Sequence, residues 1–537
     1  MKKIFIPLII LSASLFAGAQ SKSFNLGRWM QTQSALLQEL NRSYVDSLPI
    51  ERMQKASIDA MLSILDPYTI WVSEEEGEDF ELMISKTYGG IGAIIYKSDK
   101  DGPVFINEPY ADSPAAKAGL RCGDAIYAID GKTTIGLNAA EASDRMKGKP
   151  GTQVTFRVKR VYTGKDEDIT ITRERIHIPD IEYVGILEDG KTGYILLSGF
   201  TEGVANDVRS AIKELKKQGM ERLVLDLRGN GGGILQEAVK IVGLFVPKGS
   251  LVVTSKGNEY SRDEIYRTIS DPVEPHLPLI VLVDSGSASA SEIVAGSLQD
   301  YDRATIMGNR TFGKGLVQSV RPMPYGGHLK ITTAKYYIPS GRCVQAIDYS
   351  NRNEDGSVGN IPDSLTREFT TAHGRKVRDG GGITPDVELK RREYSRLTYS
   401  LVLSGIIEQY CLDYVRSHES IPPAKDYHFD DYEGFIKFAK AKEFDARTSA
   451  RASYDRMLEE LKKDGLEESM KEELEALKAK LDLDKESFLR LKKDEIVPFI
   501  EQSIVARYYF QKAAVEIAIR YDEALRQALV SPLAVSL

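Results

Sequence analysis

The sequence predicts a multidomain α/β protein with helical regions at both ends. Its 537 residues would make about three to four domains of ~150 residues each. Over residues 166–391, short apolar runs such as Leu279–Val283 alternate with helical patterns, which is typical of an α/β core. The composition, 42% hydrophobic and 28% charged, is that of a globular protein. It excludes a mostly disordered chain, a collagen and a polytopic membrane protein.

The net charge and the cysteine content narrow the classes of partner. The formal net charge is −7, from 71 basic and 78 acidic residues, which gives no electrostatic basis for binding nucleic acid. The three cysteines, Cys122, Cys343 and Cys411, match no zinc-site spacing and cannot all pair with one another. The six histidines are scattered. We therefore expect no metal, no other cofactor and no disulfide scaffold.

The first residues have the pattern of a secretory signal peptide. Two lysines precede an apolar run over residues 4–16, and an A-x-A cleavage site ends at Ala19. The alternative is a membrane anchor, but the run is short for a bilayer span and no basic stop follows it. We expect residues 1–19 to be removed and the mature chain, from Gln20, to be exported to the periplasm or the extracellular space.

Both ends of the mature chain are predicted to be helical. In residues 20–86, apolar residues recur at helical spacing, and Asp66-Pro67 ends a second helix. In residues 392–537, the stretch from Tyr454 to Lys493 is rich in Glu, Lys and Leu and lacks Pro, so it predicts long solvated helices.

A β-rich segment over residues 87–165 contains two glycine motifs. The first, GGIGA over 89–93, lets successive backbone N–H groups point inwards and hold a carboxylate, and the strand that follows offers an edge to an extended peptide. The second, AGLRCGD over 118–124, is a tight turn. Glycines that merely make turns are the alternative, but both motifs at this separation resemble PDZ domains. That resemblance implies that a peptide carboxyl terminus is bound by Gly90, Ile91, Gly92 and Ala93.

The reaction chemistry is predicted to lie between residues 284 and 318. A run of small residues, DSGSASASE over 284–292, is followed by a helical pattern. A hydroxyl at a helix start feels the N-terminal dipole and lies beside unpaired N–H groups, which suits a nucleophile whose attack creates an oxyanion. The alternative is that these serines are helix N-caps, a position that serine favours.

A lysine follows in FGKGLVQ over residues 312–318, where Lys314 stands between two glycines in an apolar setting. No histidine lies in residues 284–318, so a Ser–His pair has no local candidate. Burial disfavours the ammonium form of a lysine, and a neutral lysine can act as general base for a serine. The alternative is a lysine in a surface turn.

Residues 350–380 are rich in Gly, Asp and Asn, and we expect them to form a loop insertion.

The two motifs together resemble those of the carboxyl-terminal processing peptidases, also called tail-specific proteases, whose signatures are SASASE and FGKG-x-VQ. The nucleophilic serine of that family corresponds to Ser289. Its lysine, 25 residues further on (314 − 289 = 25), corresponds to Lys314, and the glutamine that orients the lysine corresponds to Gln318.

A further segment, LDLRGNGGG over residues 225–233, resembles the family's LDLR-x-N-x-GG turn. The resemblance implies an oxyanion hole made by the N–H of Ala290 and an N–H of Gly232 or Gly233, between which the sequence does not choose. A nucleotide-phosphate loop is the alternative, but neither G-x-G-x-x-G nor a Walker lysine fits.

The resemblance covers about residues 30–390 and implies the fold and activity. The expected fold is a crotonase-like α/β protease core over 166–391 with a PDZ domain over 87–165 inserted beside it. The expected activity is that of a serine endopeptidase that forms an acyl-enzyme. The expected partners are proteins with accessible, apolar C-terminal tails; a homodimer through the terminal helices and an adaptor protein are compatible with the resemblance.

Asp300 lies between the serine and the lysine at a position that is often acidic in that family. We favour a structural role for it, because a Ser–Lys pair needs no carboxylate and a nearby carboxylate would hold the lysine protonated.

Two other classes of function stay open at this point. One is a non-catalytic PDZ scaffold on a protease-like core, against which the intact Ser289, Lys314 and Gln318 argue. The other is an acyl hydrolase for small molecules, since the same pair of residues could serve it, against which the peptide-end clamp argues.

Overall fold

The computed structural model describes residues 22–97, 101–353, 356–390, 392–445, 448–481 and 484–531. The expected signal peptide lies outside these residues. Contacts divide the chain into two units, residues 1–71 and 72–537. The first unit contains α2 (Lys22–Ser43) and α3 (Ile50–Ser63), so the helical prediction is confirmed, and α3 ends just before Asp66-Pro67. Strand β1 (Ile70–Val72) spans the boundary, and α4 (Gly77–Ser85) begins the second unit.

The β-rich segment forms a six-stranded antiparallel sheet, a separate two-stranded ladder and two short helices, and it extends past the predicted boundary at residue 165, because its last two strands lie within residues 166–177. Its strands are β2 (Thr87–Gly90), β3 (Ala93–Tyr96), β4 (Val104–Pro109), β5 (Ala125–Ile129), β6 (Lys132–Thr133), β7 (Gln153–Lys159), β8 (Asp166–Thr172) and β9 (Glu174–His177). The order is β3-β4-β5-β7-β8, β6 pairs with β5, and β2 pairs with β9. The helices are α5 (Pro114–Lys117) and α6 (Ala139–Met146). Strand β3 is therefore an edge strand.

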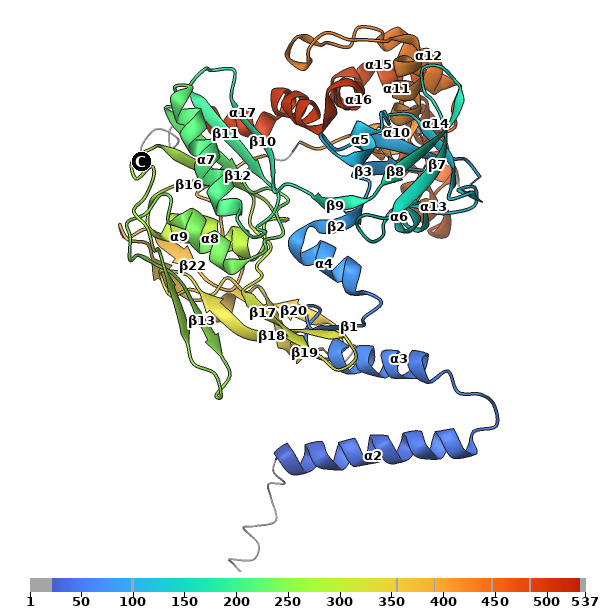
Figure 1. Cartoon of the computed structure of the whole chain (residues 1–537). Coiled ribbons are helices and arrows are strands. Elements are labelled where there is room, and N and C mark those ends of the chain that lie inside the picture. The colour runs from blue at the N-terminus through green and yellow to red at the C-terminus, as the bar shows by residue number, and fades with distance from the viewer. Residues whose placement is uncertain are drawn as a thin grey trace, which may run out of the picture. The chain divides into compact units, whose positions relative to one another are not determined.

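The core is a six-stranded sheet of β10 (Ile181–Ile186), β11 (Thr192–Leu197), β12 (Arg222–Asp226), β15 (Leu279–Val283), β16 (Thr305–Gly308) and β23 (Val387–Glu388), in that order. Only the β10–β11 pair is antiparallel. One face packs against α7 (Val204–Lys217), α8 (Leu235–Val242) and α9 (Ala290–Asp300), shown with the sheet in Figure 1. Because both faces are buried, a strand such as β15 is apolar throughout.

The other face of this sheet is covered by α17 (Glu523–Val530), which comes from the end of the described chain. Leu525 and Ala528 of this helix pack in one cluster with Val224 and Ile280 of the sheet. The C-terminal helical region thus contributes α17 to the packing of the core sheet.

A second antiparallel sheet forms one wall of the site described below. It contains β13 (Leu251–Gly257), β14 (Glu264–Arg267), β17 (Leu316–Pro322) and β18 (His328–Tyr337). Both β13 and β17 pair with β18.

The expectation of a loop insertion over residues 350–380 is wrong. This region forms two short ladders, β19 (Ile347–Arg352) with β20 (Val358–Asn360) and β21 (Glu368–Thr370) with β22 (Lys376–Arg378). These strands are mostly polar and exposed, so they carry no apolar alternation from which a strand could be predicted.

Five of the remaining C-terminal helices share an apolar core of their own: α10 (Arg396–Leu403), α11 (Ile406–Ser417), α12 (Tyr432–Lys440), α15 (Lys485–Leu491) and α16 (Lys493–Tyr521). The other two, α13 (Ser449–Lys463) and α14 (Lys471–Leu481), are joined by the hydroxyl of Tyr454, which donates to the carbonyl oxygen of Leu474 at 3.0 Å. Helix α16 is kinked at Phe510, where the N–H of Gln511 donates to the Glu108 carboxylate of β4 at 2.6 Å. A carboxylate at the start of the second half of a kinked helix complements the helix dipole there.

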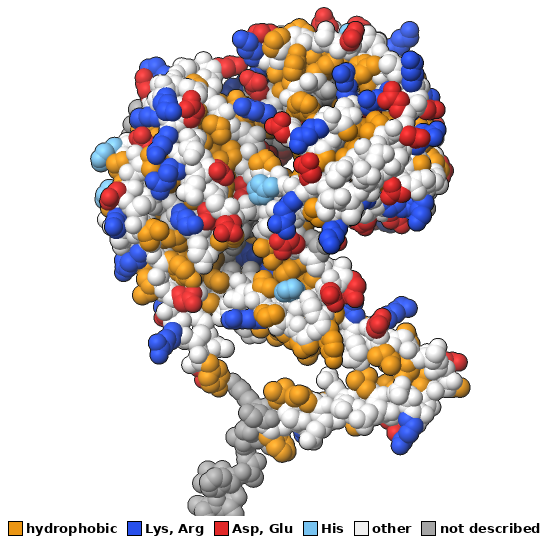
Figure 2. Space-filling model, in the orientation of Figure 1, with side chains coloured by type: hydrophobic (Ala, Val, Ile, Leu, Met, Phe, Trp, Pro, Cys, Tyr) orange, Lys and Arg blue, Asp and Glu red, His pale blue; other side chains and the backbone are white. Residues whose placement is uncertain are grey.

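On the face shown in Figure 2, acidic and basic side chains are interspersed, in keeping with the small net charge. Within the described ranges, no helix has both the length and the apolar character needed to cross a bilayer. The three cysteines are unpaired.

Candidate active site

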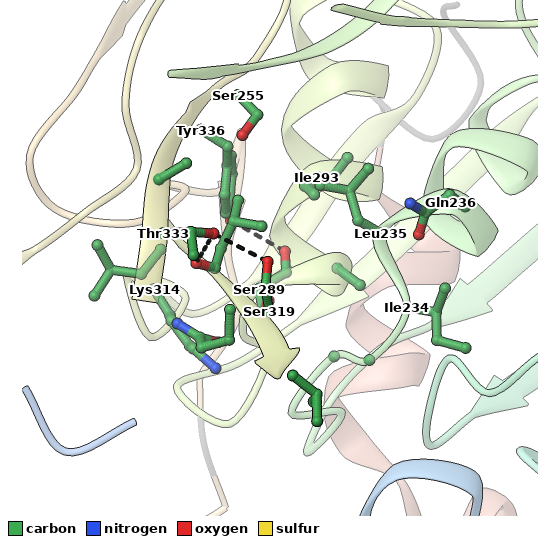
Figure 3. A pocket seen from close by; sticks show the side chains of 18 of the residues that line it. Ile234, Leu235, Gln236, Ser255, Ser289, Ile293, Lys314, Ser319, Thr333 and Tyr336 are labelled. Atoms are coloured by element: carbon green, nitrogen blue, oxygen red, sulfur yellow. Dashed lines mark hydrogen bonds between the residues drawn. The ribbon is translucent and has the colours of Figure 1, made fainter. Parts of the chain in front are cut away.

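Ser289 lies at the sharp turn that joins β15 to α9. Its backbone has φ 56° and ψ −112°, a conformation that residues other than glycine rarely adopt. Such strain persists where the surrounding contacts hold it, and a strained strand-to-helix turn exposes its side chain at the end of a sheet. Figure 3 shows Ser289 among the residues that line a cavity.

The neighbouring serines have structural contacts instead. The hydroxyl of Ser287 donates to the carbonyl oxygen of Leu227 at 2.7 Å, and that of Ser291 donates to the carbonyl oxygen of Asn230 at 2.8 Å. Both serines are fully buried. Ser289 stands at the N-cap position, as the capping alternative requires, and it is also the serine of this motif that lines the cavity.

The fully buried Glu292 connects the serine turn to the lysine loop. Its Oε2 accepts the N–H of Ser289 at 2.9 Å and the N–H of Lys314 at 2.8 Å. Its Oε1 accepts the hydroxyl of Thr311 at 2.6 Å and the N–H of Gly313 at 2.8 Å. Burial raises the pKa of Glu292, while these four donors act in the opposite direction.

Lys314 is half-buried, and the glycines beside it are packed rather than exposed. A Cβ on Gly313 would lie 2.4 Å from the Cβ of Ala346, and Gly313 has φ 86°. The N–H of Gly315 donates to Gln345 Oε1 at 2.8 Å. These contacts contradict a lysine in a surface turn, because both flanking residues are buried against the 345–346 segment and Lys314 lines the cavity.

Gln318 lies on β17 and lines the same cavity as Lys314. Its Nε2 donates to Thr332 Oγ1 at 3.2 Å. The β17–β18 register shifts between Val317 and Gln318, opposite Thr333, whose hydroxyl contacts that of Ser319 at 3.1 Å. A β-bulge re-aims the side chains around it, which is how this wall brings several polar groups to the cavity.

The glycine-rich loop after β12 lies against the serine turn. Asn230, fully buried, donates through Nδ2 to the carbonyl oxygen of Leu197 at 2.7 Å, and its own carbonyl accepts the N–H of Ala288 at 3.0 Å. A Cβ on Gly232 would lie 2.8 Å from the Cβ of Ser289 and 2.9 Å from the nitrogen of Ala290. The close approach of the two loops therefore needs glycine at this position.

The two glycines that the sequence left undivided differ in their hydrogen bonds. The N–H of Gly232 donates to Asn230 Oδ1 at 2.9 Å. Among the described residues, the N–H groups of Gly233 and Ala290 have no acceptor. Ala290 follows Ser289 in the first turn of α9, where backbone N–H groups lack helical partners. Of the two glycines, only Gly233 therefore has an N–H group that can donate beside that of Ala290.

The cavity has a volume of about 770 Å³ and a mixed lining. Apolar side chains from five elements, α4, α8, α9, β17 and β18, line it, including Met83, Leu235, Ile293, Leu316 and Tyr336. Tyr336 is buried and donates its hydroxyl to the carbonyl oxygen of Ser289 at 3.1 Å. Burial raises the pKa of Tyr336, so the phenol stays a neutral donor.

The loop predicted to hold a terminal carboxylate joins β2 to the edge strand β3. Gly92 has φ 72°, and its carbonyl accepts the N–H of Tyr110 at 2.9 Å. Ile91 is buried, and its carbonyl accepts the N–H of Ala115 at 2.9 Å. Gly90 and Ala93 end β2 and begin β3. The four predicted residues thus lie together beside an edge strand.

Asp300 is at the far end of α9 from Ser289. Its buried carboxylate pairs with Arg342 at 2.9 Å and accepts the N–H of Ser340 at 2.9 Å. These contacts are the structural role that we favoured.

Two residues that position the site, Glu292 and Asn230, were not predicted as site residues from the sequence. The signal for Glu292 was present, because a glutamate three residues after a serine at a helix start is a capping-box pattern. A signal for Asn230 was also present, because it is the asparagine of the LDLR-x-N-x-GG pattern, but its partners are distant in the sequence and only the structure shows them.

Comparison with known proteins gives three family matches. Residues 191–350 match peptidase family S41, residues 105–160 match a PDZ domain, and residues 397–530 match the C-terminal helical domain of a probable PDZ-protease. Two relatives extend these matches. A carboxy-terminal-processing protease of Bartonella bacilliformis is 37% identical over 354 residues, which is 64% of this chain and 80% of the relative. A probable CtpA-like serine protease of Staphylococcus aureus is 36% identical over 309 residues, 57% of this chain and 60% of the relative.

Two solved structures are also similar. The photosystem II D1 C-terminal processing protease is 27% identical, with a TM-score of 0.37, 69% of this chain covered and 89% of that chain covered. An S41 protease, described as putative, from Bacteroides fragilis is 17% identical, with a TM-score of 0.38, 64% of this chain covered and 84% of that chain covered.

Proposed function

This chain belongs to peptidase family S41 as a carboxy-terminal-processing serine protease with a PDZ domain, and we propose that it cleaves peptide bonds with Ser289 and Lys314 through an acyl-enzyme. The observation that carries this proposal is the arrangement around Glu292. One buried carboxylate oxygen accepts the N–H groups of both residues, and both residues line one cavity.

In the first step, Ser289 Oγ attacks the carbonyl carbon of the scissile peptide while the neutral Lys314 amine takes the hydroxyl proton. The negative charge that develops on the carbonyl oxygen is stabilised by the N–H groups of Ala290 and Gly233. We choose Gly233 over Gly232 because the N–H of Gly232 already donates to Asn230.

In the second step, the Lys314 ammonium donates its proton to the leaving amine, the C–N bond breaks, and an ester to Ser289 remains. Water then attacks the ester carbonyl carbon while Lys314 takes a proton from the water. The bond between this carbon and Ser289 Oγ breaks, Lys314 returns the proton to Ser289 Oγ, and the carboxylic acid product leaves. Gln318, on the adjacent strand and in the same cavity, positions the lysine.

Substrates are proteins with accessible, apolar C-terminal tails, which the PDZ domain holds through the N–H groups of the loop from Gly90 to Ala93. The edge strand β3 supports this role, since an extended peptide can add to an open edge.

The chain acts in the periplasm or the extracellular space after removal of residues 1–19. Apolar side chains exposed along α2, such as Trp29 and Leu36, support a homodimer through terminal helices. An adaptor that presents substrates is a further proposal.

The test uses the mature chain from Gln20, the variant Ser289→Ala and the control Ser285→Ala, an exposed serine in the same loop. A fluorophosphonate should label the wild type and Ser285→Ala but not Ser289→Ala, and a tailed protein should be cleaved by the same two chains. Labelling without peptide cleavage, but with hydrolysis of a small ester, would indicate an acyl hydrolase for small molecules. Tail binding without labelling or cleavage would indicate a scaffold.

A further inference from the structure

Lys86 stands at the joint between α4 and the first strand of the PDZ domain. Its backbone has φ 51° and ends α4, and its carbonyl oxygen accepts the N–H of Ile178 at 2.9 Å, next to the β2–β9 ladder. The main chain of Lys86 is therefore held beside the β2–β9 ladder of the PDZ domain, while its side chain reaches into the core.

The partner of this side chain is the buried Asp180. Lys86 Nζ lies 2.8 Å from Asp180 Oδ1 and donates to Ser198 Oγ at 3.1 Å. The other oxygen, Asp180 Oδ2, accepts the N–H and the hydroxyl of Thr201, at 2.7 and 2.5 Å. The Asp180 side chain is 2% exposed, so without Lys86 it would be a buried charge without its counter-ion.

The segment that Asp180 holds, residues 197–201, supports the glycine-rich loop of the active site. The carbonyl oxygen of Phe200 accepts the N–H of Ile234 at 2.7 Å, and Phe200 pairs with Gly233 in a parallel bridge. A Cβ on Gly233 would lie 2.5 Å from that carbonyl oxygen. On the other side of the loop, the carbonyl oxygen of Leu197 accepts a hydrogen bond from Asn230 Nδ2. Movement of residues 198–201 must therefore move the peptide that carries the Gly233 N–H.

We propose that Lys86 is a positioning residue for the oxyanion donor Gly233, acting through Asp180 and the 198–201 segment. The inference rests on the proposed function, in which Gly233 donates to the oxyanion. The contact between Lys86 and Asp180 connects the PDZ domain physically to the reaction. When strands β2 and β9 move away from the core, the Lys86 ammonium separates from Asp180, and the glycine-rich loop loses part of its support.

The experiment compares Lys86→Met with a control ion pair at the same joint. Lys147 of the PDZ domain pairs with Asp79 of α4 at 3.0 Å, at the surface and without contact to residues 197–201, so Lys147→Met is the matched control. With a peptide substrate, Lys86→Met should lower kcat about tenfold to a hundredfold with KM within about twofold, since loss of a whole oxyanion donor costs about 10²–10³ in kcat. Lys147→Met should retain wild-type kcat, and Lys86→Arg, which keeps the charge, should recover most of it.

A second measurement separates positioning from general destabilisation. A peptide aldehyde adds to Ser289, and its oxyanion occupies the oxyanion hole, so its affinity should fall in Lys86→Met in proportion to kcat. Binding of the uncleaved substrate peptide, measured in chains that also carry Ser289→Ala, should not change. If Lys86→Met fails to fold, Thr201→Val, which keeps the ion pair and removes one contact to Asp180, should show the same pattern at smaller size.

The inference is overturned if Lys86→Met keeps wild-type kcat, if its kcat falls while aldehyde affinity is unchanged, or if Lys147→Met shows the same loss. In any of these cases, the proposed function still holds if the wild type cleaves the peptide substrate and is labelled by the fluorophosphonate. If the wild type is neither active on the peptide nor labelled, the proposed function itself is wrong.

Discussion

The backbone N–H groups of Ser289 and Lys314, 25 residues apart in the sequence (314 − 289 = 25), donate to the same oxygen of Glu292, at 2.9 and 2.8 Å. One buried carboxylate thereby sets the distance between the turn that carries the hydroxyl and the loop that carries the amine. The hydrogen bond from its N–H to Glu292 is one of the contacts that hold the strained backbone of Ser289.

Glu292→Gln should disrupt this arrangement. An amide has one acceptor oxygen instead of two, so buried donors on one side of the side chain lose their acceptor, at a cost of about 1–3 kcal/mol each. We expect kcat to fall at least tenfold and the melting temperature to fall by several degrees. The exposed Glu433→Gln on α12 is the control. Wild-type turnover in Glu292→Gln would show that the shared carboxylate does not organise the site.

Lys314→Arg should abolish cleavage while the chain stays folded. A guanidinium keeps the positive charge but remains protonated, so it cannot accept the serine proton. Lys330 lines the same cavity, and burial lowers its pKa, which makes it the rival base. Measured with one peptide substrate, Lys314→Arg should lose about 10³-fold or more in kcat, whereas Lys330→Arg should lose less than tenfold. The reverse order would assign the proton transfer to Lys330.

Gly232→Ala should inactivate the chain, and Gly231→Ala should not. The new Cβ at Gly232 would lie 2.6 Å from the carbonyl oxygen of Ala288 and 2.8 Å from the Cβ of Ser289, at φ 97°, whereas a Cβ at Gly231 meets no atom within 4 Å. We expect Gly232→Ala to lower the rate of fluorophosphonate labelling by about 10² or more, because the displaced loop would carry the neighbouring N–H of Gly233 away from the oxyanion. Equal labelling rates in the two variants would contradict the close approach of the loops.

Amidation of a substrate's C-terminus should weaken its recognition. The amide removes the charge and brings a donor to N–H groups that need an acceptor. We expect kcat/KM for a tailed protein to fall about tenfold or more, with no change in fluorophosphonate labelling of Ser289. Equal cleavage of amidated and free-acid substrates would leave the glycines of this loop with a turn-forming role alone.

Gly92→Val tests the same loop from the protein side. Its Cβ would lie 2.5 Å from the Cβ of Ser113, at φ 72°. The control Gly136→Val has a similar φ of 85° but meets no atom within 4 Å, so it shares the strain without the clash. Cleavage of a tailed protein should fall about tenfold or more in Gly92→Val relative to Gly136→Val. Equal cleavage by the two variants would count against the carboxylate clamp.

The C-terminal helices should lose stability in acid through Glu495. Burial alone would raise its pKa, but Lys492, Ser395 and Thr398 outweigh burial and lower the pKa to about 2. In an unfolded chain the value is about 4.3, so this stabilisation is present above pH ~4.3 and is lost as the pH falls towards 2. In urea unfolding, Glu495→Gln should destabilise the chain at pH 6 and progressively less below pH 4. The exposed Glu468→Gln should show no such trend.

The sequence motifs were sufficient to predict the family, the PDZ domain, the helical ends and the protease core. Ser289, Lys314 and Gln318 were predicted because two local motifs, a run of small residues before a helix and a lysine between glycines, resemble the family's signatures. The structure places all three residues on one cavity, and their catalytic roles stay predictions. The strands between residues 347 and 378 were missed because they are short and polar, and their pairing depends on contacts rather than on an apolar period. The packing of α17 on the core sheet was missed because an amphipathic helix does not specify the surface that it covers.

The sequence by itself determined which chemical groups are available and in which local setting: a hydroxyl at a helix start, an amine between glycines, and a run of glycines after a strand. Only the tertiary structure decided which groups act on one another. It turned Ser289 rather than Ser287 or Ser291 towards the cavity and joined Lys86 to Asp180. Within the part of the chain that the structure describes, it left the N–H of Gly233 rather than that of Gly232 without an acceptor. The physical reason is that these relationships are hydrogen bonds and ion pairs between segments far apart in the chain. Their partners are selected when the sheets and helices pack, and no local period records them.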